Sequence, residues 1–163
     1  MAKKTARKNC FLISPIGKPG SEINVHANRA MEIIKEALNP LGFDVTRGDM
    51  IEKFGSITDQ IIERLLDDPI AVCDLSFHNP NVFYELAVRD TMQRPTILII
   101  RETDEIPFDQ KDMRIIRFGD LSLYKAAKSL MADISKFAKA INLNDPITNP
   151  VSRVLRHRDF STS

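Results

Sequence analysis

The sequence predicts a single α/β domain built on a five-stranded parallel sheet with helices on both faces. Short apolar segments alternate along the 163 residues with segments of helical periodicity, and the connections between them are short. The two most apolar segments, 70–74 and 96–100, have the composition of strands that are buried on both faces. This alternation predicts a doubly wound sheet, because each parallel strand needs a crossover connection to reach the next.

The expected elements follow in order along the chain. An apolar strand at 10–14 precedes a helix at 27–38 and a strand at 43–47. Ser56 is placed to cap a helix at 57–66, and Pro80 forbids a helical Asn79, so Asn81 is expected to cap a helix at 81–93. A strand at 114–118 and a helix at 123–140 with apolar residues at helical spacing follow. The predicted strand order is 2-1-3-4-5, that of a flavodoxin-like or Rossmann-like sheet, with a crevice between strands 1 and 3.

Composition and charge favour one soluble domain. A hydrophobic content of 43% can bury a full core, and we expect a domain at 9–142 between a basic tail at 1–8 and a second tail at 143–163. The net charge of +1, with basic residues gathered in the tails, argues against nucleic-acid binding. No apolar run approaches the roughly 18 residues of a membrane span. No signal-peptide pattern follows Met1, so a cytoplasmic protein is expected. Cys10 and Cys73 fall on predicted strands and no zinc spacing exists, so we expect no disulfide, metal or cofactor.

Two carboxylates lie where a predicted strand leads into a predicted helix. Asp74 ends the strand at 70–74. Glu85 lies about one turn into the following helix, from where it is expected to point back over Asp74. Because ligands gather at this edge of open α/β sheets, the two acids suggest chemistry there.

Two further segments reach the same crevice. The loop that follows the first strand contains Gly17 and Gly20, and backbone N–H groups in such a loop can approach a phosphate or a sugar closely. The segment after the second strand contains Asp49 and exposes a helix N-terminus at Ser56 that favours an anion. The plainer interpretation of the second segment, and the one preferred, is a capped surface helix with Asp59 placed against the dipole.

Three blocks of sequence carry a resemblance to a known family. They are 11–17, 55–62 and 74–86, the last of which contains the run Asn79-Pro80-Asn81-Val82-Phe83-Tyr84-Glu85-Leu86. With these blocks in this order, the chain resembles the nucleoside 2-deoxyribosyltransferase-like superfamily over roughly residues 9–120. More narrowly, it resembles the bacterial branch that borders on Toll/interleukin-1 receptor-like domains.

The resemblance implies cleavage or transfer at the N-glycosidic bond of a nucleoside, a nucleotide or NAD. In the superfamily a helix glutamate attacks the anomeric carbon, and an aspartate near the preceding strand end handles the base or the sugar hydroxyls. The matching positions here are Glu85 and Asp74. A carboxylate suits this chemistry because departure of the base leaves an oxocarbenium-like centre. The residues expected to bind the substrate are Ser14, Pro15, Ile16, Gly17, Asp49, Ser56, Ser76, His78, Asn79 and Asn81.

The resemblance also bears on assembly. Relatives work as oligomers, so a homo-oligomer is expected. No group of residues that would complete a neighbouring subunit's pocket is visible, which favours hydrolysis over 2-deoxyribosyl transfer.

Each assignment has a structural alternative. Glu85 can pair with Arg89 at i+4, Asp74 can cap the loop that follows it, and His78 can be an exposed loop residue. The charged loop at 101–112 is either a lid or an inert surface. The alternatives to catalysis are a nucleotide-sensing or signalling module that assembles on ligand binding, and a structural interaction domain.

Overall fold

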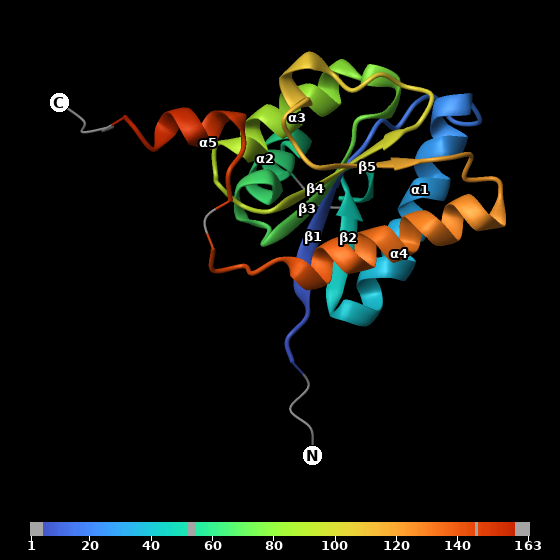
Figure 1. Cartoon of the computed structure of the whole chain (residues 1–163), viewed down its shortest axis with the longest axis horizontal. Helices are drawn as coiled ribbons and strands as arrows, with labels where there is room; N and C mark the ends of the chain where they lie inside the picture. Colours follow the sequence, from blue (N-terminus) through green and yellow to red (C-terminus); the bar gives the residue numbers. More distant parts are fainter. Residues whose placement is uncertain (1–4, 52–54, 146, 159–163) are drawn as a thin grey trace.

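The computed structural model describes residues 5–51, 55–145 and 147–158, and it confirms the predicted sheet (Figure 1). Five strands lie in the order β2-β1-β3-β4-β5, and every neighbouring pair is parallel. The loops that follow β1 and β3 therefore leave the same edge of the sheet side by side. The strands are β1 (Lys8–Ile13), β2 (Phe43–Arg47), β3 (Ile70–Asp74), β4 (Thr96–Arg101) and β5 (Ile115–Phe118).

Helices cover both faces of the sheet (Figure 1). α1 and α4 pack together on one face, and α2 and α3 pack together on the other. Ser21, Ser56 and Asn79 cap the first three of these helices with side-chain oxygens that accept backbone N–H groups. No helix in the described ranges has the length and apolar composition to cross a membrane. The helices are α1 (Glu22–Leu38), α2 (Ile57–Asp67), α3 (Pro80–Asp90), α4 (Tyr124–Ala140) and α5 (Pro150–Leu155).

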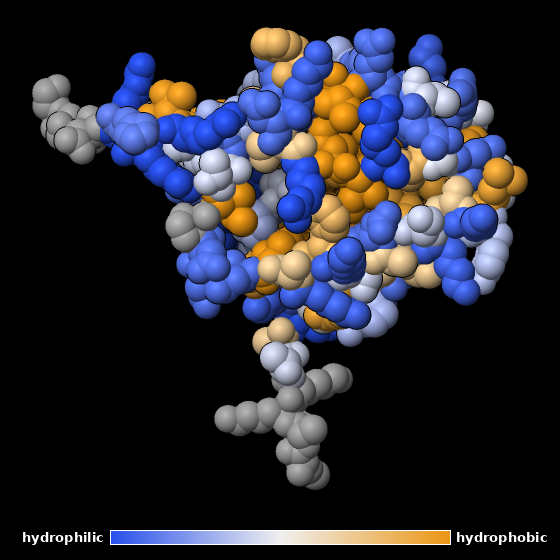
Figure 2. Space-filling view, in the orientation of Figure 1, coloured by the Kyte–Doolittle hydropathy of each residue, from blue (hydrophilic) through white to orange (hydrophobic). Residues whose placement is uncertain are grey.

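The connection from β4 to β5 has only a short 3₁₀ turn, Phe108–Gln110, where the other crossovers have long helices. Ile106, Met113 and Ile115, from this connection and from β5, are only partly buried against the core. Figure 2 shows an apolar strip in the region that lies between α3 and β5 in Figure 1, while polar side chains dominate around it.

Helix boundaries and the C-terminal segment differ from the expectations. α1 begins at Glu22 rather than at 27, because Ser21 caps it. Asn79 and not Asn81 caps α3, and Pro80 takes the first helical position, where its missing N–H costs nothing. α5 lies within the segment expected to be a tail, and the Asn149 side chain ties its start to the backbone carbonyl of Asp90 at 2.8 Å. Residues 1–4 of the expected basic tail lie outside the described residues.

The sheet separates two hydrophobic cores. Leu12 and Val72 point into the core beneath α1 and α4, whereas Ile13 and Cys73 point into the core beneath α2 and α3. Successive side chains alternate between the faces of a strand, so Asp74 lies on the α1 and α4 face. Both cysteines are free and buried, as expected.

A fully buried arginine anchors α3. Arg89 donates from Nη1 to the carbonyls of Leu65 and Asp68, at 3.0 and 2.6 Å, and from Nη2 to the carbonyl of Pro95 at 2.9 Å. Burial lowers its pKa to about 10. Because these carbonyls belong to the end of α2 and to the segment that enters β4, Arg89 fixes the position of α3 and with it Glu85, one turn earlier.

Candidate active site

A cleft opens at the carboxyl ends of β1 and β3, bounded by the first turns of α2 and α3. It consists of two adjoining hollows of about 330 and 190 Å³ that share Ser14, Ile16, Ile61 and Glu85. Together the hollows are large enough for a small metabolite. We call them the Glu85 cleft.

Glu85 is the titratable group in this cleft whose acidity burial changes most. Burial raises the pKa of this half-buried carboxyl group from 4.5 to about 7, because a charge partly removed from water loses its hydration. Among the described residues no cation forms an ion pair with it, and Arg89 donates to backbone carbonyls instead. At neutral pH both protonation states of Glu85 are therefore populated, which suits acid–base catalysis, and the ionised fraction can act as a nucleophile.

Small polar groups surround Glu85. The Asn79 side-chain oxygen accepts the backbone N–H groups of Asn81 and Val82 at 2.9 and 3.4 Å, and both asparagines line the cleft. The Ser14 hydroxyl donates to the carbonyl of Pro15 at 2.7 Å, so its oxygen can still accept a hydrogen bond. These groups suit the hydroxyls of a sugar or the oxygens of a phosphate.

The loop after β1 keeps its shape through a required glycine. Gly17 has φ +70°, and a Cβ atom there would lie 2.8 Å from the Ser21 hydroxyl and 2.9 Å from the backbone nitrogen of Asn24. The Asn24 side chain also donates to the carbonyl of Ile16 at 3.0 Å. The loop wall of the cleft is thereby fixed to the start of α1.

The segment after β2 contributes an ion pair to the cleft. Arg47 is 4% exposed, and its Nε lies 2.6 Å from Asp49 Oδ1, while Nη2 donates to Asp49 Oδ2 at 2.8 Å and to Asn28 at 2.9 Å. A hydrogen bond from this guanidinium holds the pKa of Asp49 below its ordinary value. Asp49 lines the cleft, whereas Ser56 caps α2 and is not among the lining residues. The two residues that follow Ser56 line the cleft instead.

Asp74 does not lie beside Glu85, which corrects the expected pairing. Its Oδ2 lies 2.8 Å from Nε2 of His26 on α1, and its Oδ1 accepts the backbone N–H of Ser76 at 3.0 Å. The fully buried side chain is not part of the cleft lining. The physical reason is strand alternation, which turns residue 74 toward α1 and α4 while Glu85 lies on a helix of the other face. The alternative role, a cap for the following loop, is confirmed by the Ser76 contact.

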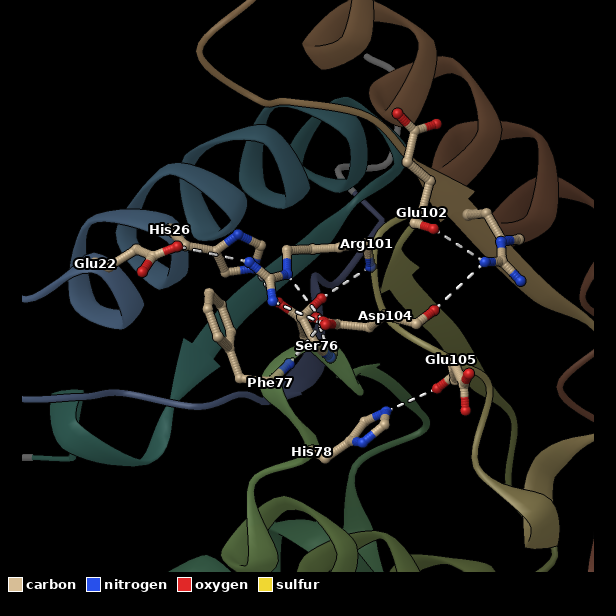
Figure 3. Close-up of polar contacts among 11 residues, drawn as sticks. Glu22, His26, Ser76, Phe77, His78, Arg101, Glu102, Asp104 and Glu105 are labelled. Carbon is tan, nitrogen blue, oxygen red and sulfur yellow. Dashed lines mark hydrogen bonds and ion pairs between the residues drawn. The ribbon is translucent and has the colours of Figure 1, made fainter.

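Three more of the residues expected to bind substrate lie outside the cleft lining. Ser76 is buried, and its hydroxyl accepts the backbone N–H of Arg101 at 3.0 Å (Figure 3). His78 is exposed, with Nε2 2.7 Å from the carbonyl of Glu105 (Figure 3). Pro15 is buried within the loop that follows β1. The charged loop expected at 101–112 accordingly contacts the segment after β3, and none of its residues lines the Glu85 cleft.

Sequence reasoning missed several residues of this edge. Thr58 and Tyr84 line the cleft, and Tyr84 is 62% exposed at its mouth. Their positions beside Ser56 and Glu85 in the resembling blocks offered a signal. His26 offered none, because it meets Asp74 across 48 positions of sequence. No group of three or more His, Cys, Asp or Glu side chains in the described part of the chain is placed to hold a metal ion.

The fold has counterparts among solved structures. One is a CMP N-glycosidase, BcmB, of Clostridium botulinum, with a TM-score of 0.56, 12% identity, and coverage of 79% of this chain and 99% of that one. Another is a 2-deoxyribosyltransferase of Bacillus psychrosaccharolyticus, with a TM-score of 0.56, 19% identity, and coverage of 86% and 98%. This chain shares the fold of these two proteins. The resemblance is thereby confirmed for the architecture. No protein-family model and no curated protein matches the sequence.

Proposed function

We propose that this protein breaks the N-glycosidic bond of a nucleoside or nucleotide in the Glu85 cleft, with Glu85 as nucleophile or oxocarbenium stabiliser. The observation that carries the proposal is the raised pKa of a half-buried glutamate that lines a metabolite-sized cleft. The cleft lies at the carboxyl ends of the strands, where open α/β sheets bind their ligands. Support comes from the two enzymes of the same fold, whose names describe N-glycosidase and deoxyribosyltransferase activities.

In the proposed reaction the ionised Glu85 faces the anomeric carbon of the bound sugar. The bond from C1′ to the base nitrogen breaks, the base leaves with its bonding electrons and takes a proton from solvent, and the carboxylate oxygen bonds to or stabilises C1′. Water then attacks C1′, gives up a proton and restores the free carboxylate. A second base in place of water would give transfer.

The surrounding groups would hold the substrate during this reaction. Ser14, Asn79 and Asn81 supply hydroxyl and amide groups within the cleft, and Tyr84 offers an aromatic face at its mouth. Asp74 contributes indirectly, because its bond to the Ser76 backbone supports the loop that leads to the Asn79 cap of α3. We therefore propose a positioning role for Asp74 in place of the catalytic one expected from the sequence.

The test is incubation of purified protein with nucleosides, nucleoside monophosphates and NAD, read by chromatography for released base. Glu85→Gln is compared with Glu63→Gln, a matched change at an exposed glutamate of α2 that does not line the cleft. We expect base release in the wild type and in Glu63→Gln, with a loss of at least about a thousandfold in Glu85→Gln.

The other outcomes have definite meanings. Release that persists in Glu85→Gln would refute the role of Glu85. Ligand binding without any release would favour the sensing module over the enzyme. A second base added to the mixture distinguishes transfer from hydrolysis. The NAD sample tests whether a dinucleotide is a substrate. Self-association stays a prediction, which light scattering coupled to size-exclusion chromatography checks.

A further inference from the structure

A second cavity lies on the other face of the sheet edge, away from Glu85. Its volume is about 580 Å³, within the range of small-molecule sites. The first half of α1 and the segments that follow β3, β4 and β5 line it, and it shares no lining residue with the Glu85 cleft. The proposed reaction uses none of its side chains.

Aromatic surfaces form one part of the cavity. The His26 ring stacks on Phe118 with centroids 5.8 Å apart and an interplanar angle of 20°, and it meets the edge of Phe77 at 5.0 Å. The Arg101 guanidinium lies over the Phe77 ring, with its Cζ 3.5 Å from the ring centroid (Figure 3). Val25 and Leu121 add aliphatic surface. Such walls favour a flat ring, which can stack and bury its faces.

The backbone at this cavity is held in an uncommon conformation. Phe77 and His78 have φ of +66° and +47°, in the left-handed region that non-glycine residues rarely adopt. Asp104 accepts the Phe77 backbone N–H at 2.8 Å and also binds the Arg101 guanidinium at 2.8 and 2.9 Å. Four polar contacts, one of them the His78 bond to Glu105, thus fix Phe77 against the cavity (Figure 3).

The cavity offers hydrogen-bond acceptors to a ligand. Both carboxylate oxygens of Asp74 accept, one from Ser76 and one from His26, so we assign the ring hydrogen of His26 to Nε2. Nδ1 is then an acceptor in the neutral ring, and no described residue bonds to it. The His26 side chain is 11% exposed and lines this cavity.

The charges of the lining favour a ligand without negative charge. Glu22, Glu102 and Asp120 line the cavity against two arginines. Arg101 is bound by Asp104 and lies 3.8 Å from Glu22, while Arg29 binds Glu32 at 3.0 Å and the carbonyl of Leu121 at 3.3 Å. Glu102 has no ion pair within the described residues. The cations are therefore neutralised, and an acidic, acceptor-rich surface remains.

We propose that this cavity is a second small-molecule site, which binds a flat, amino-substituted nitrogen heterocycle such as a free nucleobase. The aromatic and aliphatic walls take the faces of the ring, and His26 and Glu102 accept its N–H groups. This site does not depend on the function of the Glu85 cleft.

The test uses adenine and cytosine as probes, with benzoate as a flat anionic control, against methyl-labelled protein observed by NMR. Val25 and Leu121 report on the cavity, and Ile61 and Ile62 report on the Glu85 cleft. We expect adenine or cytosine to shift the cavity methyls, equally in wild type and in Glu85→Gln, and benzoate to shift neither set. Cleft-only shifts, no shifts with either base, or equal binding of benzoate would overturn the proposal.

Substitutions at the rim complete the test without disturbing the core. Val25 is 63% exposed, so Val25→Trp should fold normally while its ring fills the mouth, and Val25→Ala is the matched control. With Leu121 as reporter, we expect the tryptophan variant to lose binding by at least about tenfold and the alanine variant to retain it. Glu102→Gln should weaken binding by about three- to fivefold, as expected for one exposed charge-assisted hydrogen bond. Unchanged binding in both Val25→Trp and Glu102→Gln would place the ligand elsewhere.

Discussion

Replacement of Glu85 by glutamine should stabilise the protein at alkaline pH. The folded state holds the pKa of Glu85 near 7, whereas the group has its ordinary value of 4.5 in the unfolded chain. The folded state therefore binds the proton more tightly, and the contribution of Glu85 to stability is greatest below about pH 4.5 and is lost as the pH rises through about 7. Glutamine, which does not ionise, is free of this loss.

The magnitude follows from the difference between the two pKa values. For a fully buried group this difference corresponds to about 3 kcal/mol. Glu85 is only half-buried and water still screens its charge, so we expect about 1–2 kcal/mol. The packing around residue 85 should change little, because glutamine has nearly the same shape as glutamate.

Denaturant unfolding at about pH 5 and about pH 8 measures the effect. The stability of Glu85→Gln relative to wild type should grow by about 1–2 kcal/mol between the two conditions, whereas Glu63→Gln should show no comparable change. The comparison within each pH cancels the titration of other groups, among them Asp90, whose pKa burial raises to about 6. If wild type and Glu85→Gln change in parallel between the two pH values, Glu85 does not titrate near neutrality and the reasoning about its burial is wrong.

Further predictions concern activity and the supports of the cleft. If ionised Glu85 is the nucleophile, kcat/KM should rise with pH up to about 7 and then level off, while a fall over the same range would indicate that the protonated form acts. Asn79→Ala removes the cap of α3 and should cost about 1 kcal/mol in unfolding free energy, and Asn79→Asp should restore it. Asp74→Ala leaves the His26 ring and a buried N–H without an acceptor and should cost about 1–3 kcal/mol, with a smaller loss of activity than Glu85→Gln causes. Arg89→Met removes the side-chain donor to the carbonyls of Leu65, Asp68 and Pro95, of which, among the described residues, only that of Pro95 also accepts a backbone N–H, from Ala71. The substitution should cost about 3 kcal/mol, measured as a fall in the denaturant midpoint; an unchanged midpoint would show that the carbonyls find other donors.

The parallel pairing of the strands was predictable because it depends on alternation alone. Short apolar segments that alternate with helical ones require parallel pairing, and β3 and β2 have the bounds that were expected. The start of α1 was misplaced because the cap at Ser21 precedes the apolar periodicity that was used to find the helix. α5 was missed because six residues are too few to show a period.

The position of Asp74 shows where the reasoning stopped short of the available information. Strand alternation separates Asp74 from Cys73 and Leu75, and the two cores confirm that separation. The expected pairing of Asp74 with Glu85 was based on their proximity along the chain. It did not take into account the face of the sheet on which each side chain lies. His26, the actual partner of Asp74, comes from a helix that the crossover brings over that face.

The sequence by itself determined the order of the elements, the edge at which their polar residues gather, and the presence of Glu85 on a helix at that edge. These follow from periodicity and composition, which are local properties of the chain. The tertiary structure decided that Glu85 is half-buried with a raised pKa, that Asp49 is neutralised by Arg47, and that Asp74 meets His26 beside a second cavity. Burial and charge depend on which side chains meet across the fold, and residues far apart in the sequence make those contacts.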